Sequence, residues 1–273
     1  MASNPLETLC EHQGLSALDL MQPDNLRAFL DQKVLEFEHP DFIAPDPISI
    51  PHRYSLRQDI EVTGLLAATI AWGNRKAIVA KAGEMADRLG ADPYDFVMSA
   101  SESQIEALGS FVYRTFQQED LPGMVRGLRA IYTSNPEGGL EDLFAPRNGE
   151  TLREGMVRFR EAMVPHLAHR THKHIANVAQ GAAGKRLCMF LRWMVRSAAR
   201  GVDFGLWNKI SPAQLVIPLD VHSARTGRAL GLLQRKQNDW AAALELTEAL
   251  RQFCPEDPVK YDLALFSLSI NGF

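Results

Sequence analysis

Two short strings in the second half of the sequence carry side chains that can react together. The first, Gly184-Lys185-Arg186, offers an amine, and the second, Pro218-Leu219-Asp220-Val221-His222, offers a carboxylate. Cleavage of an N-glycosidic bond develops positive charge on the sugar, and a carboxylate stabilises that charge while an amine attacks. Lys185 and Asp220 are therefore the candidate catalytic residues.

A helix is expected to position the amine. Between Gly184 and Arg196 the apolar residues follow the spacing of a helix with one buried face, which leaves Arg192 and Arg196 together on the side facing solvent. Lys185 then lies in the first turn, where unpaired backbone N–H groups disfavour a second positive charge and so favour a nucleophilic amine. The alternative is that Lys185 is an ordinary solvated lysine. The apolar positions are Leu187, Phe190, Leu191 and Met194.

The carboxylate is expected at the start of another helix. Pro218 prevents a helix from continuing through it, and Asp220 precedes the apolar run Val221, Ala224 and Leu230. This pattern predicts that Asp220 is the N-cap of that helix. The alternative is that Asp220 is an ordinary cap without a function, contributing about 1 kcal/mol to helix stability.

Charge is distributed unevenly along the chain. The segment 166–236 contains 12 Lys and Arg against 2 acidic residues, a net charge of 12 − 2 = +10, and the remainder carries 17 − 31 = −14. The total net charge of −4 is therefore the sum of one strongly basic segment and an acidic remainder, as expected for an enzyme with a polyanion-binding site. The alternative is that these cations pair with acidic helices elsewhere in the fold.

The region around Asp220 resembles a segment of the helix-hairpin-helix DNA glycosylase superfamily. The matching string is Asp220-Val221-His222, with Arg225 five positions after the aspartate and Leu230-Gly231-Leu232 beyond it. The string Gln180-Gly181-Ala182-Ala183-Gly184 departs from the usual Leu-Pro-Gly-x-Gly hairpin, and Lys185 and Asp220 are 220 − 185 = 35 positions apart. A modified hairpin and a long connection are similar to the archaeal 8-oxoguanine glycosylase branch.

This resemblance implies a function and a set of site residues. Lys185 would be the Schiff-base nucleophile and Asp220 the catalytic carboxylate of a DNA glycosylase with abasic-site lyase activity, acting on damaged duplex DNA with a flipped base. No metal or cofactor is implied. The DNA-binding candidates are Arg186, Arg192, Arg196, His222, Arg225 and Arg228, and the base-pocket candidates are Trp72, Asn74, Arg75 and Trp193.

The expected fold is all-α. No alternating pattern longer than four residues predicts a strand, and Leu215-Val216-Ile217 is the only short β-like run. The resemblance implies a single compact unit, a two-lobed helical bundle of the helix-hairpin-helix DNA glycosylase type. Residues 52–165 would form mainly the six-helix lobe, 166–232 the hairpin-like basic segment, and 1–51 with 233–273 the second lobe, with the ligand in the cleft between lobes.

Over nearly its full length the chain also resembles a bacterial family labelled as a domain of unknown function. The strings that carry this resemblance are Pro51-His52-Arg53-Tyr54, Ala71-Trp72-Gly73-Asn74-Arg75, the run from Met189 to Arg196, and Pro218 to His222. This resemblance brings no activity with it. Two other functions therefore stay open: a non-catalytic DNA- or RNA-binding helical protein, and a helical protein that binds another protein or a small nucleotide.

Composition and length set further expectations. The chain has 273 residues, of which 46% are hydrophobic and 23% charged, as in an ordinary soluble protein. The longest nearly apolar run, from Gly64 to Trp72, is too short to cross a bilayer, and the N-terminus lacks the basic and apolar regions of a signal peptide, so a cytoplasmic location is expected, with the nucleoid if the protein binds DNA. A monomer is also expected. Cys10, Cys188 and Cys254 are too far apart to predict a disulfide framework, a zinc knuckle or an iron-sulfur cluster.

Apolar periodicity and end signals predict the remaining helices. Asn74 and Asp239 are the expected N-caps of two of them. Residues 1–20 are expected to form a short helix and a loop, and the proline-rich segment 40–51 an ordered loop. The other helices are expected at 23–38, 59–72, 75–89, 92–99, 102–109, 120–133, 151–165, 240–250 and 259–270.

Overall fold

The computed structural model describes residues 17–271, and every regular element in that range is helical. The prediction of an all-α protein is confirmed for this part of the chain, where β-type pairing is limited to isolated bridges such as Ala182 with Asp239. Residues 1–16 and 272–273 lie outside the described range, and so do Cys10 and most of the expected N-terminal helix and loop. No helix among the described residues is long and apolar enough to span a membrane.

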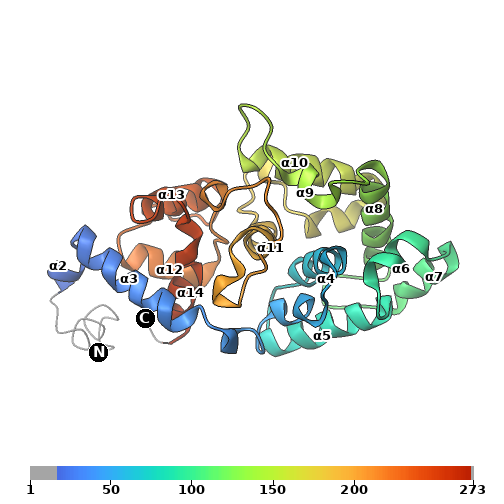
Figure 1. The fold of residues 1–273 in the computed structure, drawn as a ribbon, viewed down its shortest axis with the longest axis horizontal. Coiled ribbons are helices and arrows are strands. Elements are labelled where there is room, and N and C mark those ends of the chain that lie inside the picture. Colours follow the sequence, from blue (N-terminus) through green and yellow to red (C-terminus); the bar gives the residue numbers. More distant parts are fainter. Residues whose placement is uncertain (1–16, 272–273) are drawn as a thin grey trace.

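The larger of two groups of helices surrounds α4 (Figure 1). This helix, Arg57–Thr69, is buried along nearly its whole length, and its buried carboxylates Asp59 and Glu61 accept hydrogen bonds from Tyr94 N and the Tyr132 hydroxyl. Its neighbour across Gly64 is α11, whose Met194 Cε lies 3.3 Å from where a Cβ on Gly64 would be. The other helices of this group are α5 (Arg75–Leu89), α6 (Pro93–Ser99), α7 (Glu102–Ala107), α8 (Asp120–Ser134), α9 (Gly139–Phe144) and α10 (Leu152–Met163).

The smaller group brings the two ends of the described chain together at one end of the molecule (Figure 1). Asp31 of α3 accepts a hydrogen bond from the Tyr261 hydroxyl at 3.0 Å and pairs with Lys260 at 2.7 Å. Thr226 of α12 donates to the Leu265 carbonyl at 2.9 Å. The helices of this group are α2 (Ala17–Leu20), α3 (Pro23–Phe37), α12 (Val221–Ala229), α13 (Trp240–Arg251) and α14 (Asp262–Ile270), with the 3₁₀ turn η10 (Pro258–Tyr261) before α14.

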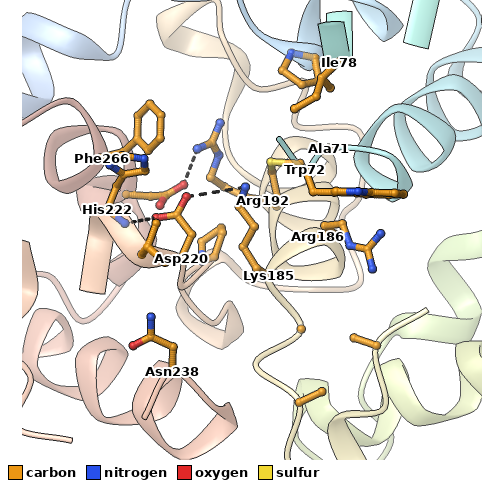
Figure 2. A pocket seen from close by; sticks show the side chains of 18 of the residues that line it. Ala71, Trp72, Ile78, Lys185, Arg186, Arg192, Asp220, His222, Asn238 and Phe266 are labelled. Atoms are coloured by element: carbon orange, nitrogen blue, oxygen red, sulfur yellow. Dashed lines mark hydrogen bonds and ion pairs between the residues drawn. The ribbon is translucent and has the colours of Figure 1, made fainter. Parts of the chain in front are cut away.

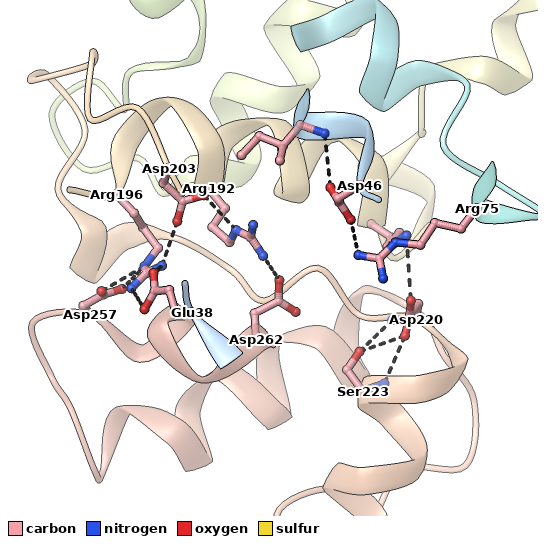
Figure 3. Close-up of polar contacts among 12 residues, drawn as sticks. Glu38, Asp46, Arg75, Arg192, Arg196, Asp203, Asp220, Ser223, Asp257 and Asp262 are labelled. Carbon is pink, nitrogen blue, oxygen red and sulfur yellow. Dashed lines mark hydrogen bonds and ion pairs between the residues drawn. The ribbon is translucent and has the colours of Figure 1, made fainter. Parts of the chain in front are cut away.

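Helix α11 (Lys185–Val195) lies between the two groups and contacts both. The expectation that Arg192 and Arg196 face solvent is wrong, since they are only 2% and 6% exposed. The smaller group covers the face of α11 that carries them, and carboxylates compensate both charges (Figure 3). Arg192 pairs with Asp203 and Asp262, and Arg196 with Glu38, Asp203 and Asp257.

The predicted N-caps Asn74 and Asp239 are confirmed. Asn74 accepts a hydrogen bond from Ala77 N at 3.1 Å, and Asp239 accepts one from Ala242 N at 3.0 Å. The proline-rich segment contains three 3₁₀ turns, η1 (Pro40–Phe42), η2 (Pro47–Ser49) and η3 (Pro51–Arg53), because proline fixes φ at a value that such turns share. Helix α4 ends at Thr69, three residues before the expected end, and α9 was not predicted.

Candidate functional site

A cavity of about 1000 Å³ lies between the two groups of helices, beside the start of α11. Its walls come from segments far apart in the sequence: the turn after α4, the 3₁₀ turn η6 (His169–His174), α11, the start of α12, and α14 (Figure 2). This volume is at the upper end of the range that ligand pockets occupy in proteins, about 300 to 1000 Å³.

Lys185 is the first residue of α11, and a tight turn fixes its backbone. Gly184, which precedes it, has φ of +69°, a left-handed conformation that favours glycine. A Cβ on Gly184 would lie 2.9 Å from Met156 Cε and 3.0 Å from Val178 Cγ1, so a larger residue would require these side chains to shift. The turn is also anchored to α13, because Trp240 N donates to the Gly181 carbonyl at 2.9 Å. The backbone before Lys185 is therefore held against α10 and α13.

Asp220 is the N-cap of α12 and uses its two carboxylate oxygens differently. Oδ1 accepts hydrogen bonds from His222 N at 2.8 Å and from Ser223 N at 3.0 Å, which confirms the predicted cap. Oδ2 lies 3.7 Å from Lys185 Nζ, and the two side chains are 31% and 18% exposed. The structure thus brings the two candidate catalytic residues together at the starts of two helices, facing one cavity (Figure 2).

A second, buried carboxyl group lines the cavity near this pair. Arg192 Nη1 donates to Asp262 Oδ2 at 2.5 Å. Burial nevertheless raises the pKa of Asp262 to about 6, because the lost solvation outweighs the attraction of the Arg192 guanidinium, and the Asp220 carboxylate acts in the same direction. Asp262 was not among the predicted site residues, and its sequence context, an acidic residue after a 3₁₀ turn, gave no signal for it.

Arg186 and Trp72 form the wall on the other side of Lys185. The Arg186 guanidinium lies 4.8 Å from the Trp72 ring centroid and donates to the carbonyls of Thr69 and Lys173. Trp72 stacks in turn on His174, with ring centroids 5.4 Å apart. Burial without a neighbouring carboxylate lowers the pKa of Arg186 to about 10.

Two of the other three base-pocket candidates line the cavity, and the third does not. Arg75 lines the cavity, where it pairs with Asp46 at 2.6 Å and lies over the rings of Phe42 at 4.7 Å and Phe266 at 5.3 Å. Trp193 also lines it but belongs to the core, with 0% exposure and an indole N–H that lacks a hydrogen-bond partner. Asn74 is exposed, does not line the cavity, and caps α5.

Of the DNA-binding candidates on α12, only His222 lines the cavity. Its Nδ1 lies 3.1 Å from Ser269 Oγ. Arg225 is exposed and donates to the Ser269 carbonyl, and Arg228 donates to the carbonyls of Arg235 and Lys236, at 2.7 to 2.9 Å. These arginines therefore hold neighbouring backbone in place.

The basic segment is partly neutralised within the protein. Seven of its 12 cations lie within 4.0 Å of a carboxylate among residues 17–271. For six of them a partner lies outside the segment, as the alternative interpretation of the charge pattern expects, whereas Lys185 pairs with Asp220 of the segment itself. The cations without such a partner in this range are Lys173, Arg186, Arg225, Arg228 and Lys236. In the described part of the chain, no group of three or more His, Cys, Asp or Glu is placed to hold a metal, and Cys188 and Cys254 are free.

The chain belongs to the family described as protein of unknown function (DUF2400), whose model matches residues 46–271. The matched range contains α4 to α14, and with them Lys185, Asp220 and the walls of the cavity apart from Phe42. Neither the search of curated proteins nor the search of solved structures gave a match.

Proposed function

We propose that this protein is a DNA glycosylase with abasic-site lyase activity, built as a two-lobed bundle of the helix-hairpin-helix glycosylase type. The observation that carries the proposal is the pairing of Lys185 Nζ with Asp220 Oδ2 at 3.7 Å, at two helix starts that face one cavity. In this reading the protein acts as a monomer on damaged duplex DNA, and the damaged nucleotide is flipped into the cavity, since its sugar cannot be attacked within the base stack.

The proposed reaction begins at C1′ of the flipped nucleotide. The Lys185 amine forms a bond to C1′ while the bond from C1′ to the base breaks, and the base leaves with the bonding electrons and takes up a proton. Opening of the sugar ring then gives a protonated imine between Nζ and C1′. Loss of a proton from C2′ to solvent water then expels the 3′ phosphate together with its bonding electrons, which cleaves the strand.

Asp220 has two roles in this reaction. Its carboxylate stabilises the positive charge that develops on the sugar, and it is the only carboxylate within 4.0 Å of Lys185 Nζ among the described residues. It therefore accepts the proton that Lys185 must lose before attack and returns a proton to the departing base. Its other oxygen remains bound to the backbone of α12, so the reacting oxygen keeps its position.

Trapping with borohydride tests the proposal, because hydride reduces the imine carbon and leaves a stable amine between protein and DNA. The wild type is expected to form a covalent adduct with abasic-site DNA. Lys185→Ala should form none, and Asp220→Asn should form it at least about 100-fold more slowly. Lys236→Ala is the matched control, because Lys236 is exposed and outside the cavity, and should behave as the wild type. An unchanged adduct in Lys185→Ala would exclude Lys185 as the nucleophile.

The second candidate is a non-catalytic DNA- or RNA-binding protein. The observation that favours it is the ion pair itself, because Lys185 and Asp220 compensate each other's charge and connect α11 to α12 as a structural contact would. Salt-dependent binding that persists in Asp220→Asn, together with the absence of any adduct or strand cleavage by the wild type, would select this candidate.

A further inference from the structure

One wall of the cavity carries positive charge that the protein itself does not compensate. Six cationic side chains line the cavity, and three of them, Arg75, Lys185 and Arg192, each pair with a carboxylate that also lines it. The other three are Arg160, Lys173 and Arg186, and none of them lies within 4.0 Å of a carboxylate among residues 17–271.

These three cations come together from α10, η6 and α11. Arg160 Nη1 donates to the His172 carbonyl at 2.8 Å and to the Ile175 carbonyl, and Arg186 donates to the carbonyl of Lys173. Both guanidinium groups are thus tied to the same short backbone segment, while the Lys173 side chain is exposed beside them. Burial lowers the pKa of Arg160 and of Arg186, and no acidic neighbour offsets that loss of solvation.

We propose that Arg186, Lys173 and Arg160 form a subsite for one phosphodiester of the DNA strand that carries the reacting sugar. This inference rests on the proposed function. An anion restores the charge balance of this wall, and planar guanidinium groups beside a lysine match the oxygens of a phosphate. Because Arg186 follows Lys185 in the first turn of α11, the phosphate bound here adjoins the nucleotide whose C1′ Lys185 attacks.

Carboxylates and uncompensated cations line different sides of the cavity. Asp220 and Asp262 belong to the start of α12 and to α14, and the uncompensated cations belong to α10, η6 and α11. A sugar at Lys185 then has the Asp220 carboxylate on one side and the phosphate subsite on the other. The subsite therefore positions the substrate and takes no part in bond making, so Arg186 and Lys173 are positioning residues.

Binding to DNA with one neutral phosphate tests this subsite. Fluorescence anisotropy is measured with duplex DNA that contains a tetrahydrofuran abasic analogue, which cannot form an imine, and with the same duplex carrying a single methylphosphonate 5′ or 3′ of the analogue. For the wild type, one of the two substitutions should weaken binding about tenfold, as expected when a charge-assisted contact is lost. Arg186→Met and Lys173→Ser should bind the unmodified duplex more weakly and lose most of their sensitivity to that same substitution.

Two controls keep the result interpretable. Lys236→Ser removes one exposed charge outside the cavity and should keep the full sensitivity to methylphosphonate. Lys173→Ser guards against misfolding, since the Lys173 side chain has no hydrogen bond or ion pair among the described residues, whereas Arg186 also contacts Thr69 and Trp72.

The subsite and the proposed reaction can fail separately. If both variants respond to every methylphosphonate as strongly as the wild type, or if no duplex binds, the subsite is wrong, even where borohydride yields an adduct with true abasic DNA. If the loss of sensitivity is found but no adduct forms, the subsite stands and the glycosylase and lyase reaction is wrong.

Discussion

At the scale of single residues, the two oxygens of the Asp220 carboxylate have different partners, which limits what a substitution of Asp220 can change. Oδ1 caps α12 and Oδ2 faces Lys185. Asparagine caps helices about as well as aspartate but carries no charge, so Asp220→Asn should keep the free energy of unfolding within about 1 kcal/mol of the wild type. Urea unfolding measures this. A much larger loss of stability would mean that the Lys185–Asp220 pair holds the fold together.

Asp262 makes a pH-dependent contribution to stability. Its pKa rises from 3.8 to about 6 in the fold, so folding favours its neutral form. The resulting stabilisation is complete below about pH 4 and is lost as the pH rises through about 6, an effect of up to about 3 kcal/mol. Urea unfolding of the wild type and Asp262→Asn at several pH values should show the wild type losing stability relative to the variant over this interval. A difference that stays constant with pH contradicts the assigned pKa.

At the scale of elements, the turn before α11 fixes the position of Lys185. Gly184 and Gly149 both have positive φ, but a Cβ on Gly184 would meet Met156 and Val178 whereas one on Gly149 would meet nothing within 4 Å. Gly149→Ala should therefore lower the free energy of unfolding by only about 1 to 2 kcal/mol, the cost of a left-handed backbone conformation at alanine. Gly184→Ala should cost about 1 to 3 kcal/mol more because of overpacking, and should slow adduct formation by displacing Lys185. Equal losses of stability in thermal or urea unfolding would contradict the steric account.

The end of α11 depends on buried charges. Arg196 joins α11 to Glu38, which follows α3, and to Asp257, which precedes η10. Replacing it with methionine leaves Glu38 and Asp203 buried without this partner, which should cost about 3 to 5 kcal/mol. Urea unfolding of Arg196→Met tests this against Arg126→Met, which breaks only the more exposed pairs with Glu102 and Glu106 and should change stability little. Similar stability losses in both variants would show that the buried network is not needed.

Helix positions were largely predictable from the sequence, and the surroundings of the helices were not. Apolar spacing and capping residues at Asn74, Asp220 and Asp239 act locally, so the starts of α5, α12 and α13 were predicted correctly. Helix α9 was missed because Gly138 and Gly139 resemble a turn. The same periodicity placed Arg192 and Arg196 on one face of α11, but only tertiary packing decides that α3 and α14 cover that face.

The candidate site was also predictable only in part from the sequence. Lys185 and Asp220 could be chosen from residue type and expected helix ends, and the structure places them together. Asp262 and Arg160 line the same cavity without any local signal, because their roles arise only when α10 and α14 pack around α11. The resemblance implies that Asn74 lies in the base pocket, but its side chain is exposed, does not line the cavity and caps α5.

At the scale of the whole molecule, internal pairing of charges limits the salt-dependent DNA binding that the proposed function requires. Seven of the 12 cations of the basic segment have carboxylate partners among residues 17–271, which leaves 12 − 7 = 5 for phosphates. In the proposed subsite Lys173 and Arg186 share one phosphate, so this segment contacts at most four phosphates. It should therefore contribute at most about −3.6 to the slope of the logarithm of the DNA-binding constant against the logarithm of salt concentration, since each phosphate contact contributes about −0.9. Anisotropy titrations over a range of salt measure the slope. A value near about −11 would require that all 12 cations contact phosphate.

The arrangement of helices explains how one site uses both groups. The larger group and α11 supply Lys185 and the cationic wall, and the smaller group supplies Asp220, Asp262 and His222. Neither group contains the whole site, so the cavity depends on how α11 packs between them. The ion pairs of Arg192 and Arg196 maintain that packing.

The most direct test is to locate the covalent bond. Wild-type protein is reduced with borohydride on abasic-site DNA, digested with protease and nuclease, and analysed by tandem mass spectrometry. We predict that the remaining sugar fragment is attached to Nζ of Lys185 and to no other amine. Attachment to another lysine or to the N-terminal amine, or intact protein without any adduct, would contradict the central claim that Lys185 and Asp220 form the reactive pair.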